Sequence, residues 1–300
     1  RSQFDRALER LRDGGSDLAA VAAALERELD RDDGASETPW GDDTAVMGIL
    51  NVTPDSFYDG GRYETVDDAI DRAERLIDAG AEIVDVGGES TRPGAETVPI
   101  DEEIERVVPV VEALAEADVA VSVDTRKAAV ARAALDAGAD IHNDVSGLED
   151  PEMRLVAAEY NVPVVVMHSI QTPVDPEANV AYDDVVTDTI DALAERVLLA
   201  EKAGLDRSQI IVDPGLGFGK STTENFELLG RLDEFRSLGC PVLVGHSRKS
   251  MFRAVDRGTA EERLAATVAA SALAAERGAD IIRVHDVAEN VAAVKTAAAA

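Results

Sequence analysis

The sequence is poor in several kinds of residue, and each shortage narrows the range of possible functions. It holds one cysteine, Cys240, so it has no disulfide framework, and within LGCPVLVG we interpret this residue as a small apolar side chain at a strand start. No apolar run approaches the roughly 20 residues that span a bilayer, and residues 1–30 are charged throughout, unlike a signal peptide. We therefore expect a soluble, cytoplasmic protein with no membrane partner.

Positive charge is also scarce in this chain. It has 29 basic against 60 acidic residues, a formal net charge of −31, and five of the basic residues are lysines. Because such a surface repels a polyanion, we expect no nucleic-acid partner. We interpret the acidic excess as a solvated surface adapted to a salty cytoplasm. Any site for an anionic substrate must then gather its positive charge locally.

What the sequence does contain is a repeated pattern of strands and helices. From residue 45 onward, short β-branched runs alternate with amphipathic, alanine-rich stretches of helical period. The predicted strands are 45–50, 82–87, 119–124, 140–145, 162–167, 209–213, 241–246 and 280–285. Four helices are predicted to end at a glycine in the left-handed conformation: Gly80, Gly138, Gly204 and Gly278. Eight such units favour an α/β fold, the closed (β/α)8 TIM barrel, over an open doubly wound sheet.

The residues before the first strand follow a different pattern. Residues 2–29 have the spacing of two helices broken at Gly14-Gly15, and a polar linker follows them. We therefore predict two regions, a short N-terminal helical extension with its linker over 1–44 and a barrel domain over 45–300. We interpret the extension as the remnant of an upstream domain.

The chemically useful residues cluster at the carboxyl ends of the predicted strands, where barrel enzymes carry their active sites. The histidines and most of the lysines lie at or near these ends: His142, His168, His246, His285, Lys127, Lys220 and Lys249. In a chain poor in both residue types, this clustering predicts a functional site at that end of the barrel.

Three generic motifs are not fulfilled. Gly215 precedes Gly219-Lys220-Ser221 with one residue too few for a P-loop, and GHSRK places Lys249 where a nucleophile elbow needs its second glycine. No H-x-H follows the first strand and no H-E-x-x-H occurs, so we interpret the histidines as hydrogen-bonding or strand-end residues rather than metal ligands.

Polar side chains end three of the strands. Asp124, Asn143 and Asp213 end the third, fourth and sixth strands. Two carboxylates and an amide that face one cavity suit a flat ligand rich in N–H donors, such as an aminopyrimidine edge. Each of them can instead cap the helix that follows. The three together with Lys249 favour a binding site.

The last two strands end in a local cluster of cations, formed by Arg248, Lys249, Arg283 and His285. Barrels often hold phosphate at these strands, and arginine suits phosphate oxygens. Pairing with helix carboxylates at i,i+4 spacing is an open alternative for Arg248, but it fits Arg283 poorly, because Arg283 lies inside an apolar strand. The polar loops NVTPDSFYDGG and GGESTRPG are either mobile connections or covers that close over a diphosphate and its Mg²⁺.

Seven motifs in order carry a family resemblance: MGILNVTPDSF, GGESTRPG, SVDT, NDVSG, DPGLGFGK, GHSRKS and RVHDV. Through them the chain resembles the dihydropteroate synthase family over about residues 45–297. The resemblance implies a transferase of folate biosynthesis, which joins 6-hydroxymethyl-7,8-dihydropterin diphosphate to p-aminobenzoate and releases 7,8-dihydropteroate and diphosphate. It also implies Mg²⁺ as cofactor, a homodimer, and a fusion to another folate-pathway domain.

The same resemblance implies a role for individual residues. The pterin-binding residues would be Asp124, Asn143, Met167, Asp213, Gly245 and Lys249. The diphosphate-binding residues would be Asn51, Thr91, Arg92, Arg283 and His285, with Asn51 also a ligand of Mg²⁺. The p-aminobenzoate pocket would be formed by Phe57, Pro93, Phe218 and Ser250. Lys249, Asp213 and Arg283 are the predicted catalytic residues, and no nucleophilic side chain is required.

Two other hypotheses stay open on the sequence alone. A pterin-dependent methyltransferase resembles this family in fold and in pterin contacts, but its chemistry needs neither the NVTPDSF loop nor the SRKS lysine. A pterin-binding barrel without catalysis is disfavoured because Asn51, Arg92, Lys249 and Arg283 are present. The sequence departs from the usual family pattern at Tyr58, at His142 and in the residues after His168.

Overall fold

The computed structural model describes residues 38–41, 43–52, 66–90, 97–169, 181–255 and 258–300. In these residues eight parallel strands alternate with helices, which confirms the predicted TIM barrel. The strands are β1 (Ala45–Asn51), β2 (Ile83–Gly87), β3 (Ala120–Asp124), β4 (Ile141–Asp144), β5 (Val164–Met167), β6 (Ile210–Asp213), β7 (Leu243–Gly245) and β8 (Ile281–Val284). Hydrogen bonding runs in the order β6-β5-β4-β3-β2-β1-β8-β7, and a bridge between Val212 and Val242 links β6 to β7 and closes the ring.

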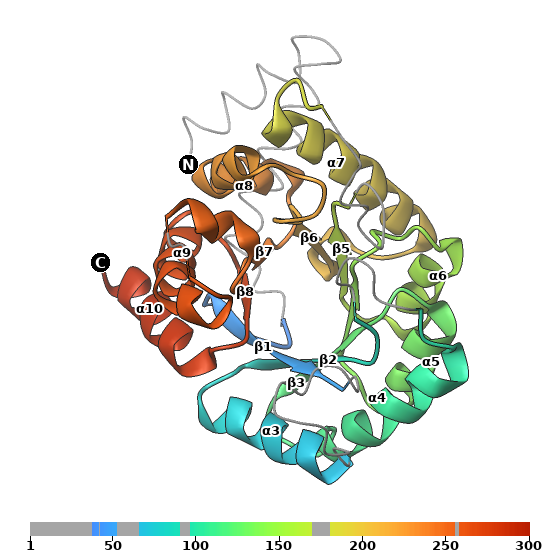
Figure 1. The fold of residues 1–300 in the computed structure, drawn as a ribbon. Helices are drawn as coiled ribbons and strands as arrows, with labels where there is room; N and C mark the ends of the chain where they lie inside the picture. The colour runs from blue at the N-terminus through green and yellow to red at the C-terminus, as the bar shows by residue number, and fades with distance from the viewer. Residues whose placement is uncertain (1–37, 42, 53–65, 91–96, 170–180, 256–257) are drawn as a thin grey trace, which may run out of the picture.

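The helices form an outer layer around this ring, as Figure 1 shows. They are α3 (Val66–Asp78), α4 (Ile100–Leu114), α5 (Ala128–Asp136), α6 (Pro151–Tyr160), α7 (Val185–Ala203), α8 (Thr222–Gly230), α9 (Leu264–Glu276) and α10 (Val287–Ala299). Short 3₁₀ turns are η2 (Arg207–Gln209), η3 (Leu232–Leu238), η4 (Ser250–Ala254) and η5 (Glu261–Arg263). The four glycines predicted to end helices have φ between 84° and 114°, which confirms their left-handed caps.

Five strands begin one residue later than predicted, and at three of them the residue at the predicted start is acidic. Glu82, Asp140 and Asp280 precede β2, β4 and β8. Their carboxylates accept hydrogen bonds from the backbone N–H groups of Val46, Val121 and Val242 on neighbouring segments, at 2.7–2.8 Å. Each acid therefore satisfies an amide near the start of the neighbouring strand with its carboxylate, while its own N–H donates to the carbonyl oxygen of the same residue.

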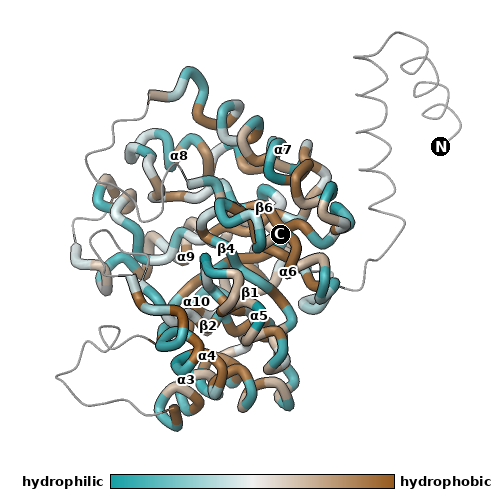
Figure 2. Tube along the Cα trace, turned by 90° about the vertical axis from the view of Figure 1, so that its right-hand side faces the viewer, coloured by the Kyte–Doolittle hydropathy of each residue, from teal (hydrophilic) through white to brown (hydrophobic). Residues whose placement is uncertain are grey.

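Two apolar clusters follow from the alternation of side chains along each strand. The larger lies between the strands and the helices, and Figure 2 shows hydrophobic residues gathered on the strands and on the helix faces turned toward them. The smaller lies inside the ring and consists of Trp40, Ala45, Met47, Ile83, Ala120, Ile141, Val165, Ile211, Leu243 and Ile281. Every strand contributes to this interior cluster, which fills the amino-terminal half of the barrel.

Two residues further along the strands, the interior side chains change from apolar to polar. This next layer is formed by Ile49, Asp85, Ser122, Asn143, Met167, Asp213, Gly245 and Arg283, of which five have polar side chains. The strand register places its members side by side: Asp85 pairs with Ser122, Met167 with Asp213, and Gly245 with Arg283. The floor of a pocket at the carboxyl end is thus polar, and it rests on an apolar plug.

Trp40 belongs to the interior of the barrel although it precedes β1. It is 8% exposed and packs with the interior cluster. The two helices predicted within residues 2–29 lie outside the described residues, so the domain boundary after residue 44 stays a prediction. In the described part of the chain, no helix combines the length and apolarity that crossing a membrane requires.

Replacing Trp40 by alanine is expected to lower the free energy of unfolding by about 3–5 kcal/mol, because the change opens a cavity beneath the polar layer. Urea denaturation followed by circular dichroism measures this loss, since Trp40 is the one tryptophan of the chain and its fluorescence disappears with it. Lys295→Ala on the exposed face of α10 is the matched control, expected within about 0.5 kcal/mol of the unchanged protein. A Trp40→Ala protein as stable as that control would contradict the packing described.

Candidate active site

Asp85 is the centre of the polar layer. It is fully buried, and its Oδ1 accepts a hydrogen bond from Ser122 Oγ at 2.6 Å. Its Oδ2 accepts from Asn143 Nδ2 at 3.0 Å and from Arg283 Nε at 2.6 Å. Sequence analysis missed Asp85, although one aspartate inside the apolar run IVDVG was a usable signal. Its carboxylate fixes the orientation of two predicted site residues, Asn143 and Arg283.

Arg283 joins two carboxylates across the barrel. Its Nη2 donates to Asp124 Oδ2 at 2.6 Å while its Nε contacts Asp85. Burial by itself lowers the pKa of Arg283, but the two carboxylates outweigh it and raise the pKa above its ordinary value. Burial raises the pKa of Asp124 to about 7, against the opposing effect of Arg283. Arg283 thus keeps two acidic groups together in a place where alone they would repel each other.

A second polar group surrounds Asp213 and Lys249. Asp213 Oδ1 accepts from Gly215 N at 2.7 Å, and the Lys249 ammonium donates to the carbonyl oxygen of Leu216. Burial lowers the pKa of Lys249 to about 8, and the charge of Asp213 partly opposes this. Burial also raises the pKa of Asp213. Lys249 Nζ lies 4.7 Å from the centre of the Phe218 ring, a cation–π contact.

Gly245 lies on the pocket floor between these two groups and carries no side chain there. A methyl group added at its Cα would lie 3.8 Å from Asp213 Oδ2 and 3.9 Å from Arg283 Cβ, without a clash. Glycine at this position therefore keeps room for a flat ligand between the carboxylate and the guanidinium.

Asn51 and Asp124 flank Gly87 at the ends of β1, β2 and β3. A methyl group on Gly87 would lie 3.7 Å from Asn51 Oδ1 and 3.5 Å from Asp124 Cβ. Among the described residues no cluster of three or more His, Cys, Asp or Glu side chains is able to hold a metal ion. Asn51 supplies one amide oxygen, which suits a Mg²⁺ ion bound mainly through water and the oxygens of an anionic ligand.

His285 is oriented by Ser247 at the ends of β7 and β8. Ser247 Oγ accepts from His285 N at 3.2 Å and lies 2.9 Å from His285 Nδ1. This arrangement lets the hydroxyl donate to Nδ1, which places the ring proton on Nε2 as a donor. Arg248 pairs with Asp286 through Nε at 2.9 Å and Nη2 at 2.5 Å. Asp286 lies just before α10 and 38 residues from Arg248, so this is an ion pair but not the i,i+4 pairing with a helix carboxylate.

The alternative that Asp124, Asn143 and Asp213 cap helices is not supported. The N-caps of α5, α6 and α8 are Lys127, Asp150 and Ser221. The three strand-end residues are 3–9% exposed and meet other residues of the pocket instead.

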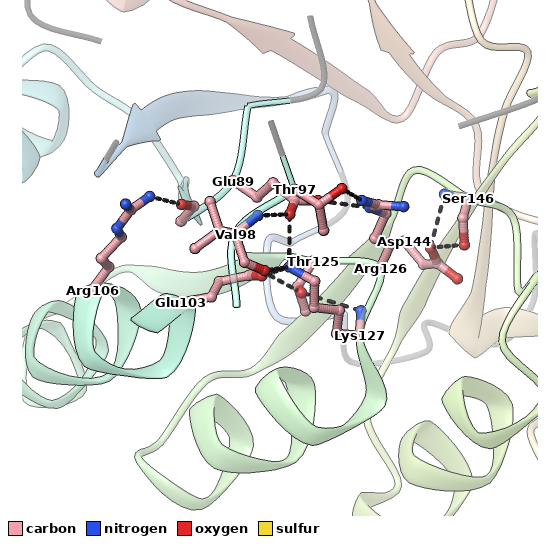
Figure 3. A network of polar contacts seen from close by, with 11 residues as sticks. Glu89, Thr97, Val98, Glu103, Arg106, Thr125, Arg126, Lys127, Asp144 and Ser146 are labelled. Carbon is pink, nitrogen blue, oxygen red and sulfur yellow. Dashed lines mark hydrogen bonds and ion pairs between the residues drawn. The ribbon is translucent and has the colours of Figure 1, made fainter. Parts of the chain in front are cut away.

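Lys127 is the centre of a network of ion pairs and hydrogen bonds beside the pocket. Its ammonium pairs with Glu89 at 2.7 Å, donates to Val98 O at 2.7 Å, and also pairs with the buried Glu103. Arg126 joins the same network through Glu89 at 2.6 Å. Figure 3 shows these side chains converging from three segments of the barrel. The network ties Glu89 to Val98, which lie on either side of residues 91–96.

Two histidines have structural roles away from the pocket floor. His142 Nε2 lies 3.3 Å from Thr125 O, and His246 Nε2 lies 3.1 Å from Thr267 O. Both rings are fully buried. His168 contacts Lys220 instead, with 2.9 Å between its Nδ1 and the lysine Nζ.

The structure describes some of the remaining predicted site residues and leaves others out. Met167 is buried within the polar layer, Phe218 is half-buried, and Ser250 is exposed at the start of η4. Phe57, Thr91, Arg92 and Pro93 lie outside the described residues.

Comparison with known proteins agrees with this arrangement. A family model described as pterin binding enzyme matches residues 47–285. A probable bifunctional folylpolyglutamate synthase/dihydropteroate synthase of Haloferax volcanii is 62% identical over 99% of this chain and 37% of its own length. The Bacillus subtilis dihydropteroate synthase is 48% identical over 81% of this chain and 84% of its own. The chain thus spans little more than a third of the bifunctional relative.

Solved structures of similar proteins resemble this chain in fold. The dihydropteroate synthase of Xanthomonas albilineans with 4-aminobenzoic acid superposes with a TM-score of 0.80 at 48% identity, covering 86% of this chain and 93% of that one. A structure of the same protein with 7,8-dihydropteroate gives a TM-score of 0.78 at 45% identity, covering 86% and 94%.

Arg283→Met is expected to lower the free energy of unfolding by about 3–5 kcal/mol at pH 8, because it leaves Asp85 and Asp124 buried without their cation. The loss is expected to shrink at pH 5, where a carboxyl of raised pKa takes up a proton and becomes neutral. Urea denaturation at the two pH values measures both effects.

The control for this prediction adds Asp85→Asn and Asp124→Asn to the Arg283→Met protein. The triple variant is expected to recover most of the lost stability, since no buried charge is left unpaired. Equal stability of Arg283→Met and the unchanged protein at pH 8 would show that the guanidinium does not hold these carboxylates together.

Proposed function

Because the chain belongs to the family of pterin-binding enzymes, we propose that it is a dihydropteroate synthase, a transferase of folate biosynthesis. Its reaction joins 6-hydroxymethyl-7,8-dihydropterin diphosphate to p-aminobenzoate and gives 7,8-dihydropteroate and diphosphate. The observation that carries this proposal is the pocket itself, in which Asp124, Asn143, Asp213 and Lys249 meet on a polar floor. The methyltransferase hypothesis loses support, because the relatives quoted above are named dihydropteroate synthases.

The pterin ring fits the donors and acceptors of this floor. Its aminopyrimidine edge presents N–H groups, which the carboxylates of Asp213 and Asp124 and the amide oxygen of Asn143 accept. The Lys249 ammonium supplies a donor for the ring carbonyl. Gly245 leaves space for the flat ring, and Met167 adds an apolar contact.

The diphosphate lies toward the ends of β1 and β8 in this proposal. Asn51 and His285 donate to its oxygens, and Arg283 reaches it through Nη1, which neither Asp85 nor Asp124 contacts. Mg²⁺, with Asn51 as one ligand, adds positive charge beside the diphosphate when it is bound. Thr91 and Arg92 belong to the same proposal, from residues that the structure does not describe.

The chemistry needs no nucleophilic side chain. The bond between the exocyclic carbon and the diphosphate oxygen breaks, and the electron pair leaves with the diphosphate, whose charge Arg283 helps to balance. The carbon that remains carries positive charge, which the electron-rich ring and the carboxylates of Asp124 and Asp213 stabilise. The amine of p-aminobenzoate then forms the new C–N bond and loses a proton. Binding both substrates in register supplies much of the rate.

The p-aminobenzoate pocket is proposed next to Lys249. Phe218 stands beside the ammonium with its ring half-buried, and Ser250 lies exposed at the start of η4. Phe57 and Pro93 complete the proposed pocket from residues outside the described ones.

Several broader features belong to the proposal as well. We propose that the chain is joined to a folylpolyglutamate synthase domain, because the bifunctional relatives of Haloferax volcanii and Halobacterium salinarum match 99% of it over 37% of their own length. A homodimer, a place in the cytoplasm and adaptation to high salt complete the proposal. The formal charge of −31 supports the last of these.

The first test is an assay in high-salt buffer with Mg²⁺, dihydropterin diphosphate and p-aminobenzoate. Dihydropteroate and diphosphate are expected in equal amounts, and omission of either substrate is expected to abolish both. EDTA is expected to suppress turnover and Mg²⁺ to restore it. A folded protein that binds the pterin diphosphate but forms no product would instead be a binding protein, and the proposed function would be wrong.

Activity is expected to depend on the charge of Lys249. Since its pKa is about 8, the ammonium loses its proton as the pH rises through that value, and kcat/KM for the pterin diphosphate is expected to fall above it. Lys249→Ala is expected to lower kcat/KM by roughly 10- to 100-fold at pH 7, the loss of one charged hydrogen bond. Lys249→Arg is the control. Because its guanidinium stays charged, the fall of kcat/KM at alkaline pH is expected to move to higher pH. Near-normal kinetics of Lys249→Ala would refute this role.

A further inference from the structure

Lys220 is a half-buried lysine that the proposed reaction does not use. Its Nζ lies 2.9 Å from His168 Nδ1, 3.0 Å from Gly215 O and 3.1 Å from Phe218 O, with His168 O further away at 3.4 Å. Burial lowers its pKa to about 7. The ammonium is thus surrounded by acceptors from the end of β5 and from the segment that follows β6, and it joins these two segments.

The segment that Lys220 holds is Pro214–Ser221, which we call the glycine loop. Gly215, Gly217 and Gly219 have φ of 68°, 84° and 65°, in the left-handed region. A methyl group on Gly215 would lie 2.0 Å from the carbonyl oxygen of His168, so the loop approaches β5 as closely as only glycine permits. The turns direct carbonyl oxygens of the loop at lysine ammoniums, two at Lys220 and one at Lys249.

The glycine loop has a second anchor in α8. Asn225 Nδ2 donates to Ser221 O at 2.7 Å and to Lys220 O at 3.1 Å, while its Oδ1 accepts from Gly217 N at 2.5 Å. Asn225 thus holds Gly217 and the end of the loop, whereas Lys220 holds the carbonyl oxygens of Gly215 and Phe218. The two anchors therefore act on different residues of the loop.

The loop connects Lys220 to the proposed p-aminobenzoate pocket. The carbonyl oxygen of Phe218 accepts from Lys220, while the ring of Phe218 stands 4.7 Å from Lys249 Nζ. The intervening Leu216 accepts from Lys249 through its own carbonyl. A change at Lys220 therefore reaches Phe218 through one backbone carbonyl, without contact between Lys220 and a substrate.

We propose that Lys220 is a positioning residue that fixes the glycine loop through His168, Gly215 and Phe218, and so sets the place of Phe218 against p-aminobenzoate. This inference rests on the proposed function. It assigns the Lys220–His168 pair to the arylamine side of the pocket rather than to the pterin side. Of the proposed pterin-binding residues, Asp124 and Asn143 come from other strand ends and have no contact with this lysine. Asp213 is linked to it only through Gly215, whose N–H donates to Asp213 and whose carbonyl oxygen accepts from Lys220.

The kinetic test compares Lys220→Met with the unchanged protein in the two-substrate assay. Loss of the Lys220 contacts with His168, Gly215 and Phe218, which we call the clamp, is expected to raise KM for p-aminobenzoate about tenfold. This is equivalent to about 1.4 kcal/mol. KM for the pterin diphosphate is expected to stay within about twofold, because Asp124, Asn143 and Arg283 keep their contacts. Lys295→Met removes the same charge from the exposed face of α10 and is expected to leave both constants unchanged.

The conservative variant Lys220→Gln keeps two N–H donors, and it is expected to restore part of the p-aminobenzoate affinity. If Lys220→Met does not fold, the same split between the two KM values is read from Lys220→Gln. An equal rise of both KM values, or no change in either, would overturn the proposal, since a merely structural lysine shows no preference for one substrate.

A spectroscopic measurement tests the clamp without any activity. Burial and the nearby charge of Lys220 lower the pKa of His168 to about 3, with a smaller contribution from Arg196. Nitrogen NMR of labelled histidine is expected to show His168 Nδ1 as an unprotonated acceptor that does not titrate between pH 5 and 8. In Lys220→Met its pKa is expected to rise, and His168→Gln assigns the signal among four histidines.

The kinetic and NMR measurements distinguish a failure of the proposed function from a failure of this inference. If the unchanged protein forms no dihydropteroate, the proposed function is wrong, while the NMR signal still reports on the clamp. If product forms but His168 titrates near its ordinary pKa in the unchanged protein, Lys220 does not clamp the loop and this inference is wrong.

Discussion

The ion pairs of Arg283 with Asp85 and Asp124 are the interaction on which the rest of the pocket depends. Two carboxylates inside a barrel repel each other and lose hydration, so they need a cation and hydrogen bonds to remain there. The guanidinium supplies the charge, and Ser122 and Asn143 supply the hydrogen bonds. The acceptors that we propose for a pterin edge are thereby held in place by the protein itself.

This polar layer is stable because of what lies beneath and around it. Interior residues of the preceding layer are apolar on every strand, and Trp40 joins them from the segment before β1. Water is excluded below the pocket, which strengthens electrostatic contacts above it. The strongly acidic surface makes the location of cations decisive: Lys249, Arg283 and His285 gather at one end of the barrel while the chain as a whole carries −31.

Lysines in this protein also position loops. Lys127 ties Glu89 to Val98, and Lys220 ties the glycine loop to the end of β5. In both cases one ammonium gathers acceptors from separate segments, because it has three donors on a long flexible stem. Three of the five lysines in the chain, Lys127, Lys220 and Lys249, follow the carboxyl ends of strands. These lysines thus position loops, besides supplying positive charge for an anionic ligand.

The sequence by itself determined the eight-unit barrel, its strands to within a residue or two, and the strand ends that carry Asp124, Asn143, Asp213 and Lys249. Alternation of strands and helices is written in local periodicity, and the motifs are contiguous. Only the tertiary structure decided which groups meet. Asp85 and Arg283 lie 198 residues apart and touch because β2 and β8 both flank β1. The pairing of Arg248 with Asp286 and the clamp of Lys220 on His168 likewise join strand ends distant in sequence, and no local pattern encodes contacts of that kind.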